Sequence, residues 1–183
     1  MRFVKNSVTL ALLMLLTTLA AALLSACADN QQASKNAQAQ SSVEAETLPA
    51  SLRDHLTVYK SPSCGCCGEW VEHIQAAGLQ SSTEHPEDLS AIKTKLGVPE
   101  NLRSCHTAVS RQGYFFEGHI PARYVQKFLD NPPPDSIGLT VPGMPVGSPG
   151  MEVDDKFMPY KVFSIQADGS AVVYASIDSP AMQ

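Results

Sequence analysis

Apolar residues recur along the chain at two spacings, and the two spacings predict strands and helices. Short runs rich in β-forming residues predict strands at 56–59, 79–83, 107–109 and 114–116, and a terminal hairpin of 161–165 with 171–174. Intervals of three and four predict helices at 64–77, from Asp88 to Leu96, and from Pro121 to the prolines at 132–134.

These elements follow the order strand, helix, strand, helix, strand, strand, helix, and a run of cysteines joins the first strand to its helix. The order is typical of an α/β fold, namely a thioredoxin-like sandwich with a mixed sheet. The C-terminal β-hairpin is an addition to it. Residues 135–159 are rich in Pro, Gly and Met and predict a long loop, and long ordered loops are usually functional.

Residues 1–26 have the character of a secretory signal peptide. Arg2 and Lys5 precede an apolar run, which ends in Leu24-Ser25-Ala26-Cys27 and resembles the bacterial lipobox, where the cysteine is lipidated. The run nearly spans a bilayer, so an uncleaved anchor is the alternative. Either interpretation places the domain at a membrane outside the cytoplasm. We expect Cys27 to anchor it on the periplasmic side of a bacterial membrane.

Residues 27–51 are rich in Gln, Ala and Ser and contain no aromatic residue. Because such a segment cannot bury enough apolar surface to order itself, we expect a lipidated cysteine followed by a flexible linker. The folded thioredoxin-like domain then covers residues 52–178.

Composition narrows the class of protein. With 183 residues, 44% of them hydrophobic, the chain has room for one domain and its appendages. A net charge of −5 argues against a nucleic-acid partner and gives no attraction to anionic lipid. Lipid on Cys27 would therefore have to provide the tether.

With Cys27 assigned to lipid, four of the five cysteines remain for chemistry. Cys64, Cys66 and Cys67 fall at the predicted N-terminus of a helix, and Cys105 lies further along the chain. Positions i and i+3 share a helix face, so Cys64 and Cys67 can pair as a redox dithiol. The helix dipole favours thiolate there.

Three interpretations compete for this motif. A structural disulfide suits an oxidising compartment. Thiol–disulfide exchange would use Cys64 and Cys67 and gives Cys66 no role. Soft-metal binding uses all three sulfurs, because three thiolates within four residues suit Cu(I) well and zinc acceptably.

Further candidate ligands favour the metal. Cys105 and His106 precede the third predicted strand, whose start lies beside the cysteine motif in a thioredoxin-like fold. His119 lies between the fourth strand and the third helix, and Met144 and Met151 lie in the long loop. Thiolate, imidazole and thioether together favour copper over zinc.

Four motifs carry a resemblance to a known family. They are YKSPSCGCC at 59–67, SCHTA at 104–108, EGHIP at 117–121 and VPGMPVGSPGME at 141–152. The chain resembles, over residues 54–177, the CopG-like family of periplasmic or lipid-anchored proteins associated with copper resistance. The resemblance implies a thioredoxin-like fold and copper, one ion or several, bound by the four cysteines with His119 and the loop methionines as further ligands.

We therefore expect a periplasmic, membrane-tethered copper-binding protein of copper resistance. It either sequesters Cu(I) or cycles copper between Cu(I) and Cu(II), so whether it is an enzyme, a copper oxidoreductase, stays open. Cys64 and Cys67 are the redox candidates, and a copper-delivery or electron-transfer partner is expected. The alternatives are a thiol–disulfide oxidoreductase acting on envelope proteins and a structural lipoprotein. The expected metal ligands are Cys64, Cys66, Cys67, Cys105, His106, His119, Met144 and Met151.

Overall fold

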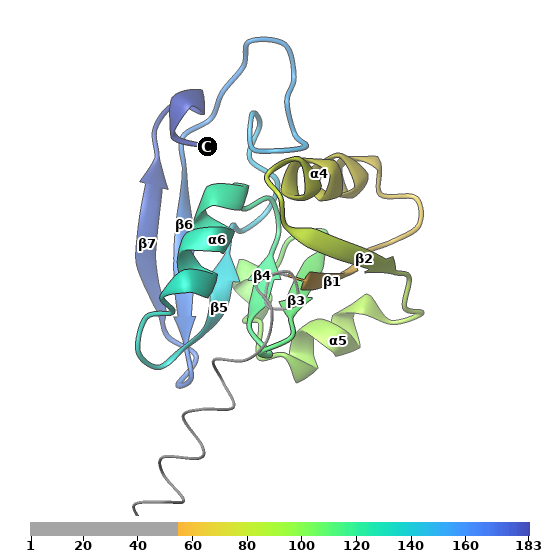
Figure 1. Ribbon diagram of the computed structural model, residues 1–183, viewed down its shortest axis with the longest axis vertical. Coiled ribbons are helices and arrows are strands. Elements are labelled where there is room, and N and C mark those ends of the chain that lie inside the picture. The colour runs from red at the N-terminus through yellow and green to blue at the C-terminus, as the bar shows by residue number, and fades with distance from the viewer. Residues whose placement is uncertain (1–54) are drawn as a thin grey trace, which may run out of the picture. The chain divides into compact units, whose positions relative to one another are not determined.

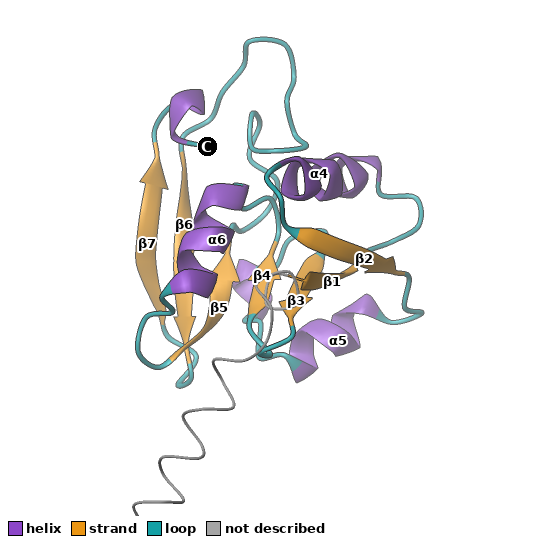
Figure 2. Ribbon diagram, viewed as in Figure 1, coloured by secondary structure: helices purple, strands orange, loops and turns teal. Residues whose placement is uncertain are grey.

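Seven strands form one mixed sheet in the computed structural model, which describes residues 55–183 (Figures 1 and 2). The strands are β1 His55–Tyr59, β2 Gln80–Glu84, β3 Thr107–Ser110, β4 Phe115–Glu117, β5 Ser136–Thr140, β6 Tyr160–Gln166 and β7 Ala171–Ile177. The helices are α4 Gly65–Ala76, α5 Leu89–Lys95 and α6 Ala122–Asp130, with 3-10 turns at Glu100–Leu102 and Pro180–Met182.

The strands lie in the order β2-β1-β3-β4-β5-β6-β7. The pairs β1–β2 and β4–β5 are parallel, and the other neighbours are antiparallel. From β1 to α6 the chain follows the order expected for a thioredoxin-like fold, and β6 and β7 form the terminal hairpin. The α/β class with a mixed sheet and an added hairpin is confirmed.

Adjacent residues of β4 point to opposite faces of the sheet, as the pleat requires. Phe116 packs with Trp70 of α4 and Phe128 of α6 in the main core. Phe115 packs with Val98 in a smaller cluster on the other face. Figure 1 accordingly shows α4 and α6 on one side of the sheet and α5 on the other. Trp70, expected in the core, is fully buried.

One strand was wrongly predicted as loop. Residues 136–140 form β5, which pairs with β4 on one side and β6 on the other. The strand contains Gly138, where a Cβ would collide with the carbonyl oxygen of Phe115. Close approach of the two backbones therefore demands a glycine, and a glycine in a five-residue run conceals the strand pattern.

The second helix begins as predicted, because the side chain of Asp88 accepts a hydrogen bond of 2.9 Å from the amide of Ala91. Its expected apolar face is only half-buried: Leu89, Ile92 and Leu96 keep intermediate exposure. The residue that α5 buries most deeply is Lys93, at 4% exposure. A specific polar partner must therefore receive its ammonium group.

The signal peptide at 1–26, the lipid-bearing Cys27 and the linker to residue 51 lie outside the described residues. Within residues 55–183, no helix has the length and apolar character needed to cross a membrane.

Candidate metal centre

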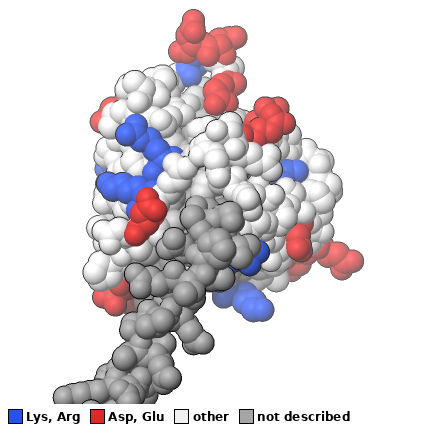
Figure 3. Space-filling model, in the orientation of Figure 1, with Lys and Arg blue, Asp and Glu red and all other residues white. Residues whose placement is uncertain are grey.

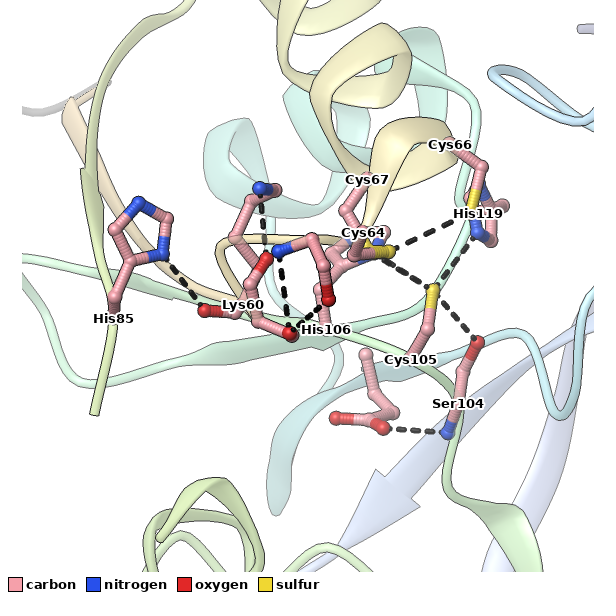
Figure 4. The surroundings of a disulfide bond; sticks show 12 residues. Lys60, Cys64, Cys66, Cys67, His85, Ser104, Cys105, His106 and His119 are labelled. Carbon is pink, nitrogen blue, oxygen red and sulfur yellow. Dashed lines mark hydrogen bonds between the residues drawn. A yellow bond between two sulfur atoms is a disulfide. The ribbon is translucent and has the colours of Figure 1, made fainter. Parts of the chain in front are cut away.

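The cysteine run lies at the first turn of α4, which follows β1 after a short turn (Figure 4). The end of β1 is fixed by the Lys60 amide, which donates to the carbonyl of Glu84 at 3.1 Å. A turn follows, closed by the Cys64 amide on the carbonyl of Ser61 at 3.1 Å. Cys64 occupies the N-cap position of the helix, without a capping hydrogen bond from its side chain, so the three sulfurs gather at the helix N-terminus.

Four sulfur atoms lie within 4.8 Å of one another, from Cys64, Cys66, Cys67 and Cys105. Cys64 and Cys67 form a disulfide, and Cys66 and Cys105 are free thiols. The Cys66 sulfur lies 3.5 Å from that of Cys64, and the Cys105 sulfur lies 3.3 Å from that of Cys67. The structure thus brings together all four cysteines predicted for the site.

Both predicted histidines lie against Cys105, as Figure 4 shows. Its sulfur is 3.3 Å from Nδ1 of His106 and 3.0 Å from Nε2 of His119. The Nδ1 of His119 lies 2.8 Å from the carbonyl of Pro149, which only accepts, so Nδ1 carries the proton and Nε2 presents its lone pair to the sulfur. A neighbour that fixes the imidazole in this way is typical of metal-binding histidines.

His106 is fully buried, and its ring packs against Trp70 with centroids 4.4 Å apart. Its Nε2 has no hydrogen-bond partner among the described residues, while its Nδ1 faces Cys105. A buried imidazole with so few partners is unusual, because buried polar atoms are normally hydrogen-bonded. The ring is held by packing, with one nitrogen aimed at the sulfur cluster.

Burial sets the protonation of these groups. It lowers the pKa of His119, and it lowers the pKa of His106 well below its usual value, with further contributions there from His119 and Lys93. Burial also raises the pKa of Cys105 to about 11, and the neighbouring Cys66 adds to the shift. Metal ligation needs neutral imidazole and thiolate, so the histidines are ready for it and Cys105 must lose its proton to the binding event.

The long loop between β5 and β6 lies on the site. Gly150 has φ +79, and a Cβ there would come within 2.6 Å of the carbonyl oxygen of Cys66 and 2.8 Å of the amide nitrogen of Trp70. The loop backbone therefore rests directly on the first turn of α4. Met144 is 51% exposed and Met151 is half-buried beside Gly150, and their role as ligands stays a prediction.

The loop also carries negative charge. Glu152, Asp154 and Asp155 are exposed on it, and Figure 3 shows acidic side chains gathered at the top of the view, where this loop lies. Charge of this sign raises the local concentration of cations.

Sequence reasoning missed one polar feature beneath the site. Lys93 of α5 forms a buried salt bridge of 2.5 Å with Glu117 of β4, and both ions also contact Ser104, the neighbour of Cys105. A signal was present, because Lys93 follows Leu89 by four residues and precedes Leu96 by three. A lysine on the apolar stripe of a helix indicates a buried partner.

Clustered sulfurs at a helix N-terminus, with two neutral imidazoles beside them on an α/β sheet, define a sulfur-rich site that could hold a soft metal ion once the disulfide is reduced. Comparison with known proteins identifies the family. A family model described as "Protein of unknown function, DUF411" matches residues 102–151. No curated protein matches the chain.

Two solved structures match over nearly their whole length. "Copper resistance protein copG- Form 1" is 41% identical, with a TM-score of 0.64, and the match covers 68% of this chain and 98% of that one. "Copper resistance protein copG- Form 2" has the same identity and TM-score, with 67% and 97% covered. The chain belongs to the CopG-like copper-resistance family, as its four motifs predicted.

Proposed function

We propose that this protein binds copper at the sulfur cluster, on the periplasmic side of a bacterial membrane, and so contributes to copper resistance. One observation carries the proposal: the Cys105 sulfur lies within contact distance both of the cysteine motif and of two imidazole nitrogens. The copper-resistance role of the related structures supports the choice of metal.

The donor set suits both valences of copper. Sulfur ligands stabilise Cu(I), whereas imidazole also accepts Cu(II). When the disulfide is reduced, the site offers four thiolates and two imidazoles, which is enough for one ion or several. A mixed site can keep the ion through a change of valence, so we propose that the protein cycles copper between Cu(I) and Cu(II), exchanging electrons with a separate electron-transfer partner.

The disulfide supports a second candidate, a thiol–disulfide oxidoreductase acting on envelope proteins. Cys64 is partly exposed at a helix N-terminus and is bonded to the buried Cys67, an arrangement typical of an attacking and a resolving thiol. This chemistry needs neither Cys66 nor the histidines.

Replacing Cys66 separates the two candidates, since Cys66 lies outside the disulfide. We expect Cys66→Ser to weaken Cu(I) affinity, measured by competition with a chromophoric chelator, by about tenfold or more, the effect of losing about 1.4 kcal/mol of binding free energy. Exchange with a peptide disulfide should stay unchanged. Cys64→Ser is the matched variant, because it removes both activities. Wild-type copper affinity in Cys66→Ser would refute the copper site as drawn.

The proposed location is tested by fractionation. Because the predicted lipobox places lipid on Cys27, we expect the wild-type protein in the membrane fraction. Cys27→Ser should either release the protein or leave the signal peptide uncleaved. Recovery of wild-type protein wholly in the soluble periplasmic fraction, with no lipid on Cys27 by mass spectrometry, would overturn the anchoring proposal.

A further inference from the structure

The salt bridge between Lys93 and Glu117 lies directly beneath the segment that carries Cys105. Lys93 is 4% exposed and Glu117 is fully buried. The ammonium group is 2.5 Å from the carboxylate. Thr107 of β3 donates its hydroxyl to the second carboxylate oxygen. The side chain of Glu117 is therefore held by contacts with both β3 and α5.

Each ion makes a further contact, and both contacts are with the same residue. Lys93 donates to the carbonyl of Ser104 at 2.6 Å, and Glu117 accepts from the amide of Ser104 at 2.6 Å. Both backbone polar groups of Ser104 are therefore held by the ion pair, and Figure 4 shows the contact at the amide. The Ser104 hydroxyl donates in turn to the carbonyl of Gly143 in the long loop.

We propose that Lys93 and Glu117 are positioning residues for Cys105: they fix Ser104 so that the next side chain points its sulfur at Cys67, His106 and His119. Cys105 belongs to both groups of candidate ligands, so its direction decides whether the sulfurs and the imidazoles form one site. That this placement serves copper rests on the function proposed above.

The arrangement explains why an ion pair occupies this position. Replacing a buried ion pair by apolar residues is often neutral or even stabilising, so stability alone is weak grounds for its presence. Apolar side chains could fill the same volume, but they could not hold an amide and a carbonyl of one residue at once. Charge-assisted hydrogen bonds supply that directional restraint.

The test measures the mobility of Cys105 without copper. The full-length protein, with the Cys64–Cys67 disulfide intact, is treated with iodoacetamide, and alkylation of Cys105 and Cys66 is followed in the same molecules by peptide mass spectrometry. Cys66 serves as the internal reference. The main variant is Lys93→Met/Glu117→Leu, which removes both charges and leaves no unpaired ion. Lys93→Met/Glu117→Gln keeps an acceptor for the Ser104 amide, so its ratio of the Cys105 to the Cys66 alkylation rate should lie between those of the wild type and the main variant.

A control separates positioning from general loss of stability. Ile165→Ala creates a cavity in the smaller core cluster and leaves the contacts of Ser104 untouched. With both rates extrapolated to the fully ionised thiols, we expect the main variant to raise the ratio of the Cys105 rate to the Cys66 rate about tenfold, equivalent to about 1.4 kcal/mol of local opening free energy, and Ile165→Ala to leave it nearly unchanged. If the main variant does not fold, the glutamine variant decides the question by the same ratio.

A ratio that changes no more in the ion-pair variants than in Ile165→Ala would overturn the proposal and leave the pair a purely structural role. Cu(I) affinity provides a second measurement, and in the main variant it should fall to that of Cys105→Ser. If alkylation responds but copper affinity does not, the positioning role stands and the copper function of Cys105 fails. The two proposals are therefore distinguishable.

Discussion

Gly150 is the residue at which the long loop touches the first turn of α4. Its φ of +79 and the 2.6 Å approach to the carbonyl of Cys66 both exclude a side chain. We expect Gly150→Ala to lower the free energy of unfolding by about 1–2 kcal/mol from the left-handed backbone, and by roughly another 1–3 kcal/mol from the collision. Urea unfolding of the copper-free protein measures this change.

Gly143 is the matched control in the same loop. It has φ +67, but a Cβ there would meet nothing within 4 Å. Gly143→Ala should therefore show the backbone cost alone and keep wild-type copper affinity, whereas Gly150→Ala should also weaken copper binding. Equal effects of the two substitutions would mean that the loop does not depend on its contact with α4.

Substitution of the loop methionines tests whether the loop supplies ligands to copper. A thioether is a neutral and weaker ligand than a thiolate, so Met144→Leu/Met151→Leu should weaken copper binding or shift its redox potential by less than Cys66→Ser does. Leucine keeps the volume and removes the sulfur. Met158→Leu is the control, since Met158 is 55% exposed on the same loop and lies outside the predicted ligand set. Copper affinity, stoichiometry and potential all unchanged in the double variant would exclude both residues as ligands.

The meeting of the cysteines and histidines in one cluster could be predicted from sequence better than the contacts that support the cluster. Cys64 and Cys67 could be paired from spacing alone, and Cys105 and His119 followed from the expected fold. Whether the first pair would be a disulfide or two metal ligands stayed open, because the same thiols serve both chemistries. The contacts of Lys93 with Glu117 join residues 24 positions apart, on a helix and a strand, and no local pattern specifies such a pairing.

At the level of elements, α4 and α6 cap each other. The side chain of His73 on α4 accepts a 3.0 Å hydrogen bond from the amide of Ala122, the first residue of α6. In return, Gln126 of α6 donates to the carbonyl of Ala77 at the end of α4 at 2.8 Å. Each contact satisfies a backbone group that a helix end leaves unpaired.

The His73 contact predicts a pH dependence. Burial lowers the pKa of His73 below 6.5, although Glu152 partly opposes the shift, and only the neutral ring can accept from Ala122. Below about pH 6.5 the unfolded chain binds a proton that the folded chain resists, so His73 should destabilise the fold as the pH falls. We expect the melting temperature to drop more between about pH 7 and pH 5 in the wild type than in His73→Gln, which can still accept the hydrogen bond.

His106 and His119 titrate in both proteins, so their contribution cancels in the difference between the two melting curves. Parallel pH dependences would show that His73 makes no such contribution. The comparison uses copper-free protein, because metal on the other histidines would add its own pH dependence.

Most elements could be predicted because their patterns are local. The strand β1, the helix α4 and the terminal hairpin follow from alternation, from a three-and-four repeat and from a turn sequence. The strand β5 could not be predicted in this way, because the neighbouring strand, and not a pattern within β5 itself, requires the glycine at 138. On α5, Lys93 is buried more deeply than the residues of the expected apolar face, because its salt-bridge partner Glu117 lies on β4.

At the level of the whole molecule, the candidate cysteine and histidine ligands come from three separate segments. The motif at the start of α4, the residues before β3 and the turn between β4 and α6 supply them, and the loop after β5 lies against them. These segments meet only when the sheet is formed, so the complete ligand set is a property of the folded state. Copper should therefore stabilise folding through the difference in its affinity for the folded and unfolded chains.

The size of this stabilisation can be predicted. A ligand that binds only the folded state adds RT ln(1 + [L]/Kd), about 2.7 kcal/mol at 100-fold excess over Kd. For a domain of this size that corresponds to a rise in melting temperature of roughly 10 °C. We expect the rise with Cu(I) after reduction of the Cys64–Cys67 disulfide, and a smaller rise with the disulfide intact, because Cys66 and Cys105 are then the thiols left. Scanning calorimetry of both forms measures it. The Cys64→Ser/Cys66→Ser/Cys67→Ser variant should show little gain, and an equal gain in that variant would place the copper site elsewhere.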